Sequence, residues 1–229
     1  MVRAPRFLFC LAALSINIIA ASVQATPIAV AGFTFADGER SFADDAFIVS
    51  GVITGADNAG VQRILVGSNI ADSFNTGDSG GGIVEVRFLD NVVVNGPGTD
   101  LVIFELSGDQ PPGTPDPREV FGFSVWNGTA FSSFTTMTPI ATGFPDPADA
   151  TLDIFKIEID LSSFGLLASA STDRVRLHIY NANLGSKSAD LTALGAMNSS
   201  PVPEPASGTL VATGLLALFA LSREMRCRT

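Results

Sequence analysis

The sequence predicts an all-β fold, an antiparallel β-sandwich of the jelly-roll type, from three observations. Apolar and polar residues alternate with a period of two in several short segments, which is typical of half-buried strands. Clusters rich in Gly, Pro, Asn and Asp separate these segments and predict tight turns. Helical segments do not alternate with the strands, so a parallel α/β sheet is not expected. An apolar content of 46% is enough to build a packed core.

The strands are placed by their alternation. The segment "DIFKIEIDL", residues 153–161, alternates from residue 155 on, with one face made of Phe155, Ile157, Ile159 and Leu161 and the other of Lys156, Glu158 and Asp160. Residues 173–182 and 83–90 alternate in the same way. Further strands are expected at Ala46–Ile53, Gln62–Val66, Val92–Val94, Leu101–Leu106, Val120–Trp126, Phe131–Thr135 and Leu191–Met197. A helical turn is expected at 161–167. The proline-rich stretch 110–117 is expected to be a loop, because proline cannot occupy a central strand.

The N-terminal segment has the three parts of a secretory signal peptide. Arg3 and Arg6 precede an apolar stretch at 7–21, and Val23-Gln24-Ala25 is a small-x-small cleavage pattern. We therefore expect a signal helix at residues 1–25, with signal peptidase cutting after Ala25.

The C-terminal segment also has three parts. Val202, Pro203, Glu204 and Pro205 precede a 16-residue apolar run at 206–221, and Arg223, Arg226 and Arg228 follow it. As a helix the run would span about 24 Å, less than the roughly 30 Å of a hydrocarbon core. It predicts a single, marginal transmembrane helix whose basic end stays cytoplasmic.

The order of these three parts closely resembles the PEP-CTERM sorting signal of exported proteins in Gram-negative bacteria. The resemblance implies that an exosortase removes the tail after transient anchoring in the inner membrane, and that the body reaches the cell surface or extracellular matrix. An ordinary C-terminal anchor is the alternative. The chain then divides into a signal peptide (1–25), a β-sandwich domain (26–200) and a sorting signal (201–229).

The charge of the body excludes one class of partner. Residues 26–200 contain eight Lys and Arg against twenty-one Asp and Glu, a net charge of −13. Such a body repels phosphate backbones, so nucleic-acid binding is not expected. It suits a soluble exported domain or a calcium binder. The only cysteines, Cys10 and Cys227, lie in the terminal segments, so the body has no thiol chemistry and no disulfide.

The stretch "GDSGG" at 77–81 matches the surroundings of a protease nucleophile but lacks the partners of one. A serine nucleophile needs a histidine base; His178 is the only histidine, and it follows Ser79 where the trypsin-like order puts it first. No strand–turn–helix elbow surrounds Ser79 either. We interpret the stretch as a glycine-rich turn and expect no catalytic residue.

Four segments resemble a recurring group in secreted bacterial surface proteins. They are "GGGIVEVRFLD" (80–90), "DNVVVNGPGTDLVIFELSG" (90–108), "IDLSSFGL" (159–166) and "ADLTALGAM" (189–197). The resemblance implies a galactose-binding-like or carbohydrate-module-like jelly roll and carries no catalytic residues.

Calcium is the one cofactor that the residues suggest. Asp100, Glu105 and Asp190, with carbonyls of the turn at 95–99, are the candidate ligands, because calcium takes six to eight oxygens. The alternative is that Asp100 caps its turn and Glu105 is only the polar partner in a strand.

These observations favour an exported, exosortase-sorted surface or matrix protein with a non-catalytic adhesion or structural role. The first alternative is a carbohydrate-binding module that contacts extracellular polysaccharide. Against it, the body has only Trp126 and Tyr180 besides its phenylalanines to line a sugar cleft. A hydrolase with an unrecognised site is the third hypothesis.

Overall fold

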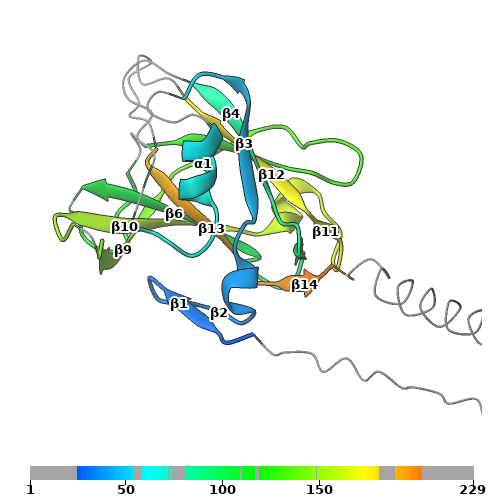
Figure 1. Cartoon of the computed structure of the whole chain (residues 1–229), viewed down its shortest axis with the longest axis horizontal. Helices are drawn as coiled ribbons and strands as arrows, with labels where there is room; N and C mark the ends of the chain where they lie inside the picture. Colours follow the sequence, from blue (N-terminus) through cyan, green and yellow to red (C-terminus); the bar gives the residue numbers. More distant parts are fainter. Residues whose placement is uncertain are drawn as a thin grey trace, which may run out of the picture.

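The computed structural model describes residues 25–53, 58–71, 73, 81–108, 110–116, 119–147, 149–180 and 189–202 (Figure 1). These residues form mostly β structure, and every strand pairing is antiparallel. The five-stranded sheet has the order β3 (Asp45–Gly51), β4 (Gly82–Arg87), β12 (Arg174–Ile179), β7 (Phe121–Val125) and β8 (Thr135–Met137). The four-stranded sheet has the order β13 (Leu191–Ala196), β6 (Leu101–Gly108), β10 (Leu152–Ile159) and β9 (Ile140–Pro145). The prediction of an all-β fold with antiparallel sheets is confirmed.

The two sheets share one apolar core. Alternate residues of β4, β7 and β12 point inward from the five-stranded sheet, and alternate residues of β6, β10 and β13 meet them from the other side. Its fully buried members include Phe121 and Phe123 of β7 and Ile103 of β6. The period-two alternation therefore has its physical cause in this shared interior.

Two small sheets complete the fold. β11 (Ser171–Thr172), β5 (Asn91–Val94) and β14 (Ser199–Pro201) form a three-stranded sheet, with β5 in the centre. β1 (Ile28–Val30) pairs with β2 (Phe33–Phe35) as an N-terminal hairpin. Five strands were not predicted from the sequence, and each has at most six residues: β1, β2, β9, β11 and β14.

The prediction of a strand at Gln62–Val66 is wrong, because this segment belongs to the helix α1 (Asn58–Leu65). Val61, Ile64 and Leu65 have the spacing i, i+3, i+4, which puts them on one helical face. All three are buried in the core, and the helix lies against β3 and β13. The three consecutive apolar residues at 64–66 fit a strand and a buried helix equally well.

The strand predicted at Phe131–Thr135 is also displaced, because β8 begins only at Thr135. Residues 127–130, which precede the predicted strand, form a turn. The side-chain oxygen of Asn127 holds this turn by accepting hydrogen bonds from the backbone N–H groups of Thr129 (3.0 Å) and Ala130 (2.9 Å). Phe131 makes only a single bridge to Trp126. Local side-chain bonds of this kind compete with a strand ladder.

The helical turn predicted at 161–167 is present as the short 3-10 helix η3 (Leu161–Phe164). The side chain of Asp160 caps it by accepting a bond from the N–H of Ser162 (2.9 Å). Gly165 ends it with a φ of 82°, a left-handed conformation that glycine adopts without strain. A second 3-10 helix, η1 (Gly38–Ser41), follows the N-terminal hairpin.

The N-terminal hairpin covers the outer face of the four-stranded sheet, beside which Figure 1 shows it in blue. Phe35 is fully buried, with its ring centre 4.6 Å from that of Phe42 and 6.1 Å from that of Phe104. A Cβ atom at Gly195 of β13 would lie 2.4 Å from the Phe35 ring. Glycine at this position is therefore what lets the Phe35 ring approach the strand so closely.

Candidate functional site

The outer face of the five-stranded sheet carries a set of arginine, acidic and aromatic side chains. Alternation puts Val84 and Val86 of β4 in the core, so Glu85 and Arg87 point outward. Antiparallel pairing places Arg176 of β12 directly opposite Glu85. We call the following set the arginine–aromatic face: Phe47, Glu85, Arg87, Trp126, Phe131, Asp173, Arg174 and Arg176.

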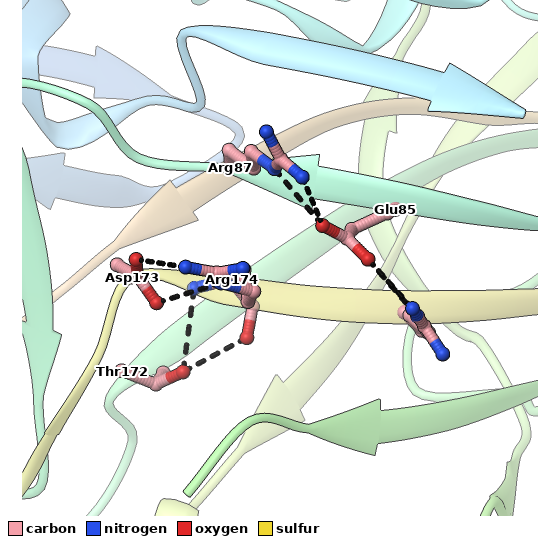
Figure 2. A network of polar contacts seen from close by, with 6 residues as sticks. Glu85, Arg87, Thr172, Asp173 and Arg174 are labelled. Carbon is pink, nitrogen blue, oxygen red and sulfur yellow. Dashed lines mark hydrogen bonds and ion pairs between the residues drawn. The ribbon is translucent and has the colours of Figure 1, made fainter. Parts of the chain in front are cut away.

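Glu85 is the centre of this face (Figure 2). Arg87 donates from Nε (2.9 Å) and Nη2 (2.8 Å) to Oε1, and Arg176 donates from Nε (3.1 Å) and Nη2 (2.9 Å) to Oε2. Burial alone would raise the pKa of Glu85, because its side chain is only 4% exposed. The hydrogen bonds and charges of the two arginines outweigh burial and lower the pKa, so the carboxylate stays ionised.

Arg174 forms a second pair, with its neighbour Asp173 (Figure 2). Its Nε donates to Oδ1 (3.0 Å) and its Nη2 to Oδ2 (2.8 Å), which is the bidentate geometry of a strong charge-assisted pair. This bonding lowers the pKa of Asp173 and raises the pKa of Arg174. The hydroxyl of Thr172 donates to the carbonyl oxygen of Arg174 (2.8 Å) and fixes the backbone at this point.

Each of the three guanidinium groups also lies over an aromatic ring. The Cζ atom is 4.5 Å from the ring centre of Phe47 for Arg87, 3.8 Å from Phe131 for Arg176, and 5.2 Å from Trp126 for Arg174. The rings of Trp126 and Phe131 in turn contact each other, with centres 5.1 Å apart. Cation–π contacts together with carboxylate bonds hold the planar groups in fixed orientations.

The three arginines keep donors available for a ligand. The carboxylates bond only the Nε and Nη2 atoms, and within the described residues nothing accepts from Nη1 of Arg87, Arg174 or Arg176. Their side chains are 36%, 31% and 29% exposed. The face therefore presents oriented N–H donors, carboxylate acceptors and ring surfaces together.

Three further rings lie beside this face. His178 of β12 lies between Phe134 and Tyr180, with ring centres 5.2 and 4.7 Å away. A Cβ atom at Gly122 would approach the Tyr180 hydroxyl to 2.9 Å, so the absence of a side chain there makes room for these rings. Burial lowers the pKa of His178, which favours the neutral ring at pH 7. Ser79 lies outside the described residues, so its relation to His178 stays a prediction.

A hollow of about 400 Å³ opens at the edge of the arginine–aromatic face, and we call it the β5 hollow. Its apolar wall consists of Phe88, Leu89, Val92, Trp126 and Val202, and Ser171 and Asp173 add polar atoms. Its volume lies within the roughly 300–1,000 Å³ of typical ligand pockets. Leu89 is 60% exposed and Val202 is 38% exposed.

The candidate calcium ligands do not form one site. Asp100 is fully buried, and its Oδ1 accepts from the N–H of Gly96 (2.7 Å) and from Asn198 Nδ2 (2.8 Å). Its Oδ2 accepts from the N–H of Leu161 (2.9 Å). Asp100 therefore holds the turn at 95–99 against η3, as the alternative hypothesis expected. No group of three or more His, Cys, Asp or Glu side chains in the described parts of the chain is arranged to hold a metal ion.

Glu105 belongs to a different, buried acidic group. It is fully buried, next to the side chain of Glu119 and to Asp190. Burial, the adjacent carboxyl of Glu119 and the charge of Asp190 hold the pKa of Glu105 well above its ordinary value. The protonated form is therefore favoured, which is the state in which two neighbouring carboxyl groups can bond each other.

The sorting features lie largely beyond the part of the chain that the structure describes. Ala25 and Val202 are its first and last residues, and the stretch 203–229 and the signal segment 1–24 fall outside it. Within the described ranges, no helix has the length and hydrophobicity needed to cross a membrane.

No family model matches the sequence, and no curated protein matches it. Among solved structures, the chain is similar to the C-terminal domain of a chitobiase from Bacteroides fragilis, with a TM-score of 0.40 and 16% sequence identity. The match covers 70% of this chain and 97% of that chain.

Sequence analysis found the outward residues of β4 and β12 but missed the face that they form. The signal was present: "VEVR" and "RVRLH" each place charges on the polar side of a strand. What joins them is the pairing of Glu85 with Arg176, which are 91 positions apart. Nothing in the local pattern specifies that register.

Proposed function

We propose that this protein is an exported, exosortase-sorted component of the cell surface or extracellular matrix that binds neutral polysaccharide without cleaving it. The observation that carries the binding is the arginine–aromatic face. Sugar hydroxyls both donate and accept hydrogen bonds, so they match a surface with guanidinium donors beside carboxylate acceptors. The apolar faces of sugar rings match aromatic surface such as that of the half-buried rings of Trp126 and Phe131.

The charges on this face favour a neutral polysaccharide over an anionic one. Glu85 and Asp173 already neutralise two of the three guanidinium charges, and the body carries a net charge of −13. An anionic polymer would be repelled at long range and would compete with these carboxylates at short range. A neutral polymer uses the remaining Nη1 donors without displacing a carboxylate.

We propose a non-catalytic role because the acids on this face are unsuited to acid–base chemistry. A glycosidase of the common type needs one carboxyl group with a raised pKa, which acts as the general acid. The pKa values of Glu85 and Asp173 are lowered instead. Glu105 has a raised pKa but is fully buried in the sandwich.

We also propose the jelly-roll topology and the sorting route. In support of the jelly-roll topology, the chain passes repeatedly between the two sheets, from β4 to β6, β7, β10, β12 and β13.

The proposed sorting route depends on the sequence of the two termini. Deleting Pro203–Pro205 should prevent release of the tail and leave the protein in the membrane fraction. A deleted form that reaches the surface with its tail removed as in the wild type would contradict the sorting proposal.

The binding proposal is tested with the full chain, purified in detergent, on an array of neutral and acidic glycans. We expect binding to neutral polysaccharides, and loss of that binding in Arg176→Ala and Trp126→Ala. Retained binding in both variants would place the ligand elsewhere. Hydrolysis of the bound polysaccharide would overturn the non-catalytic role.

A further inference from the structure

The folded sandwich holds the chain up to Val202. β14 pairs with β5 through Ser199–Val93, Ser200–Val92 and Pro201–Asn91, and the N–H of Val202 then donates to the carbonyl oxygen of Asp90 (2.9 Å). The sequence reaches the apolar run at Ala206 only four residues later. Even a fully extended chain covers no more than about 14 Å over four residues.

The β5 hollow surrounds this exit point. Val202 is part of its wall, together with the exposed Leu89 of the β4–β5 turn and the only tryptophan of the chain, Trp126. Asp173, the carboxylate in the wall of the hollow, is bonded by Arg174, and Asp90 faces Arg40 (3.8 Å). Asp44 accepts from the N–H groups of Leu89 (2.6 Å) and Asp90 (3.3 Å). An apolar hollow with a tryptophan and a paired carboxylate in its wall therefore lies where the chain leaves the domain.

We propose that, while the chain is anchored, the β5 hollow lies against the phospholipid bilayer, with Trp126 and Leu89 at the boundary between headgroups and acyl chains. This rests on the proposed anchoring by the apolar run at 206–221. Four residues are too short a tether to hold the sandwich clear of the surface. Tryptophan prefers this boundary because its ring is apolar and its N–H is polar, and a shallow apolar surface adds binding in proportion to the area it buries.

Trp126 itself reports on this contact. The full chain is reconstituted into phosphatidylcholine vesicles with or without bromine atoms near the top of the acyl chains, and tryptophan emission is recorded. We expect brominated lipid to reduce Trp126 emission. A flexible Gly/Ser insert of roughly twenty residues after Val202, with an end-to-end distance of about 25 Å, should restore it.

Paired variants and a flotation assay complete the test. Leu89→Asp should weaken the quenching, whereas Phe144→Asp, which changes a side chain of similar exposure on the other sheet (47%), should leave it unchanged. If the chain floats with the vesicles but brominated lipid does not change Trp126 emission, the docking proposal is overturned and the anchoring proposal stands. A chain that does not float overturns the anchoring as well, and with it the docking.

Discussion

The outer faces of the two sheets differ in chemical character. The N-terminal hairpin covers the four-stranded sheet, and phenylalanines such as Phe35 and Phe104 pack between them. The five-stranded sheet instead carries buried and half-buried charges, with Glu85 only 4% exposed and still ionised. Burying an unpaired carboxylate costs folding free energy. Two arginines, Arg87 and Arg176, pair with Glu85 and offset this cost. A face that serves only stability could be covered with apolar residues, as the opposite face is.

The largest expected effect is on the covered face. Phe35→Ala removes a fully buried ring that contacts Phe42, Phe104 and Gly195, and should lower the free energy of unfolding by about 3–5 kcal/mol. Urea unfolding monitored by circular dichroism measures this. A loss below about 1 kcal/mol would mean that the hairpin is not an integral cover of the sheet, and the contrast between the two faces would fail.

The second prediction concerns Glu105, the buried glutamate whose pKa is raised rather than lowered. The pKa of Glu105 is raised, so the folded state keeps its proton while the unfolded state loses it above its ordinary pKa. Stability should therefore fall as the pH rises through that window. Glu105→Gln should raise the free energy of unfolding at pH 8 by about 1–3 kcal/mol and change it little at pH 4. Thermal unfolding across pH 4–8 tests this, and equal effects at both ends would contradict it.

Glu85 should behave in the opposite way. Its pKa is lowered, so its contribution to stability is present above the ordinary carboxyl pKa and is lost as the pH falls through the lowered one. Glu85→Gln should cost about 1–2 kcal/mol at pH 7 and much less in acid. Glu158→Gln is the matched control, since Glu158 pairs with Lys156 on the other sheet and is 42% exposed. If the two variants lose equal stability at pH 7, Glu85 is an ordinary surface residue.

The fold was largely predictable because its main strands show their alternation directly, as β10 and β12 do. The hairpin was not, since β1 and β2 have three residues each, too few to show a period. Helix α1 was mistaken for a strand because Val61, Ile64 and Leu65 show helical spacing only when residues before 62 are included.

The candidate site was less predictable than the fold. Strand alternation put Glu85 and Arg176 on polar faces, but only the pairing of β4 with β12 brings them together. The structure does not bring the predicted calcium ligands together into one site, for a related reason. Asp100 and Glu105 are close in sequence, yet one ends a turn and the other lies five residues along a strand, inside the sandwich.

The central claim is that the arginine–aromatic face binds neutral polysaccharide. The full chain in detergent is titrated calorimetrically with the neutral polysaccharide that binds best among soluble glucans, galactans and mannans. Arg176→Ala removes a guanidinium group stacked on Phe131, and Lys156→Ala is its control, because Lys156 stacks on Phe33 at 5.0 Å on the covered side. We predict that Arg176→Ala weakens binding by about tenfold, or 1.4 kcal/mol, and that Lys156→Ala leaves it unchanged. Equal affinities for the two variants, or no binding of any neutral polysaccharide by the wild type, would contradict the account.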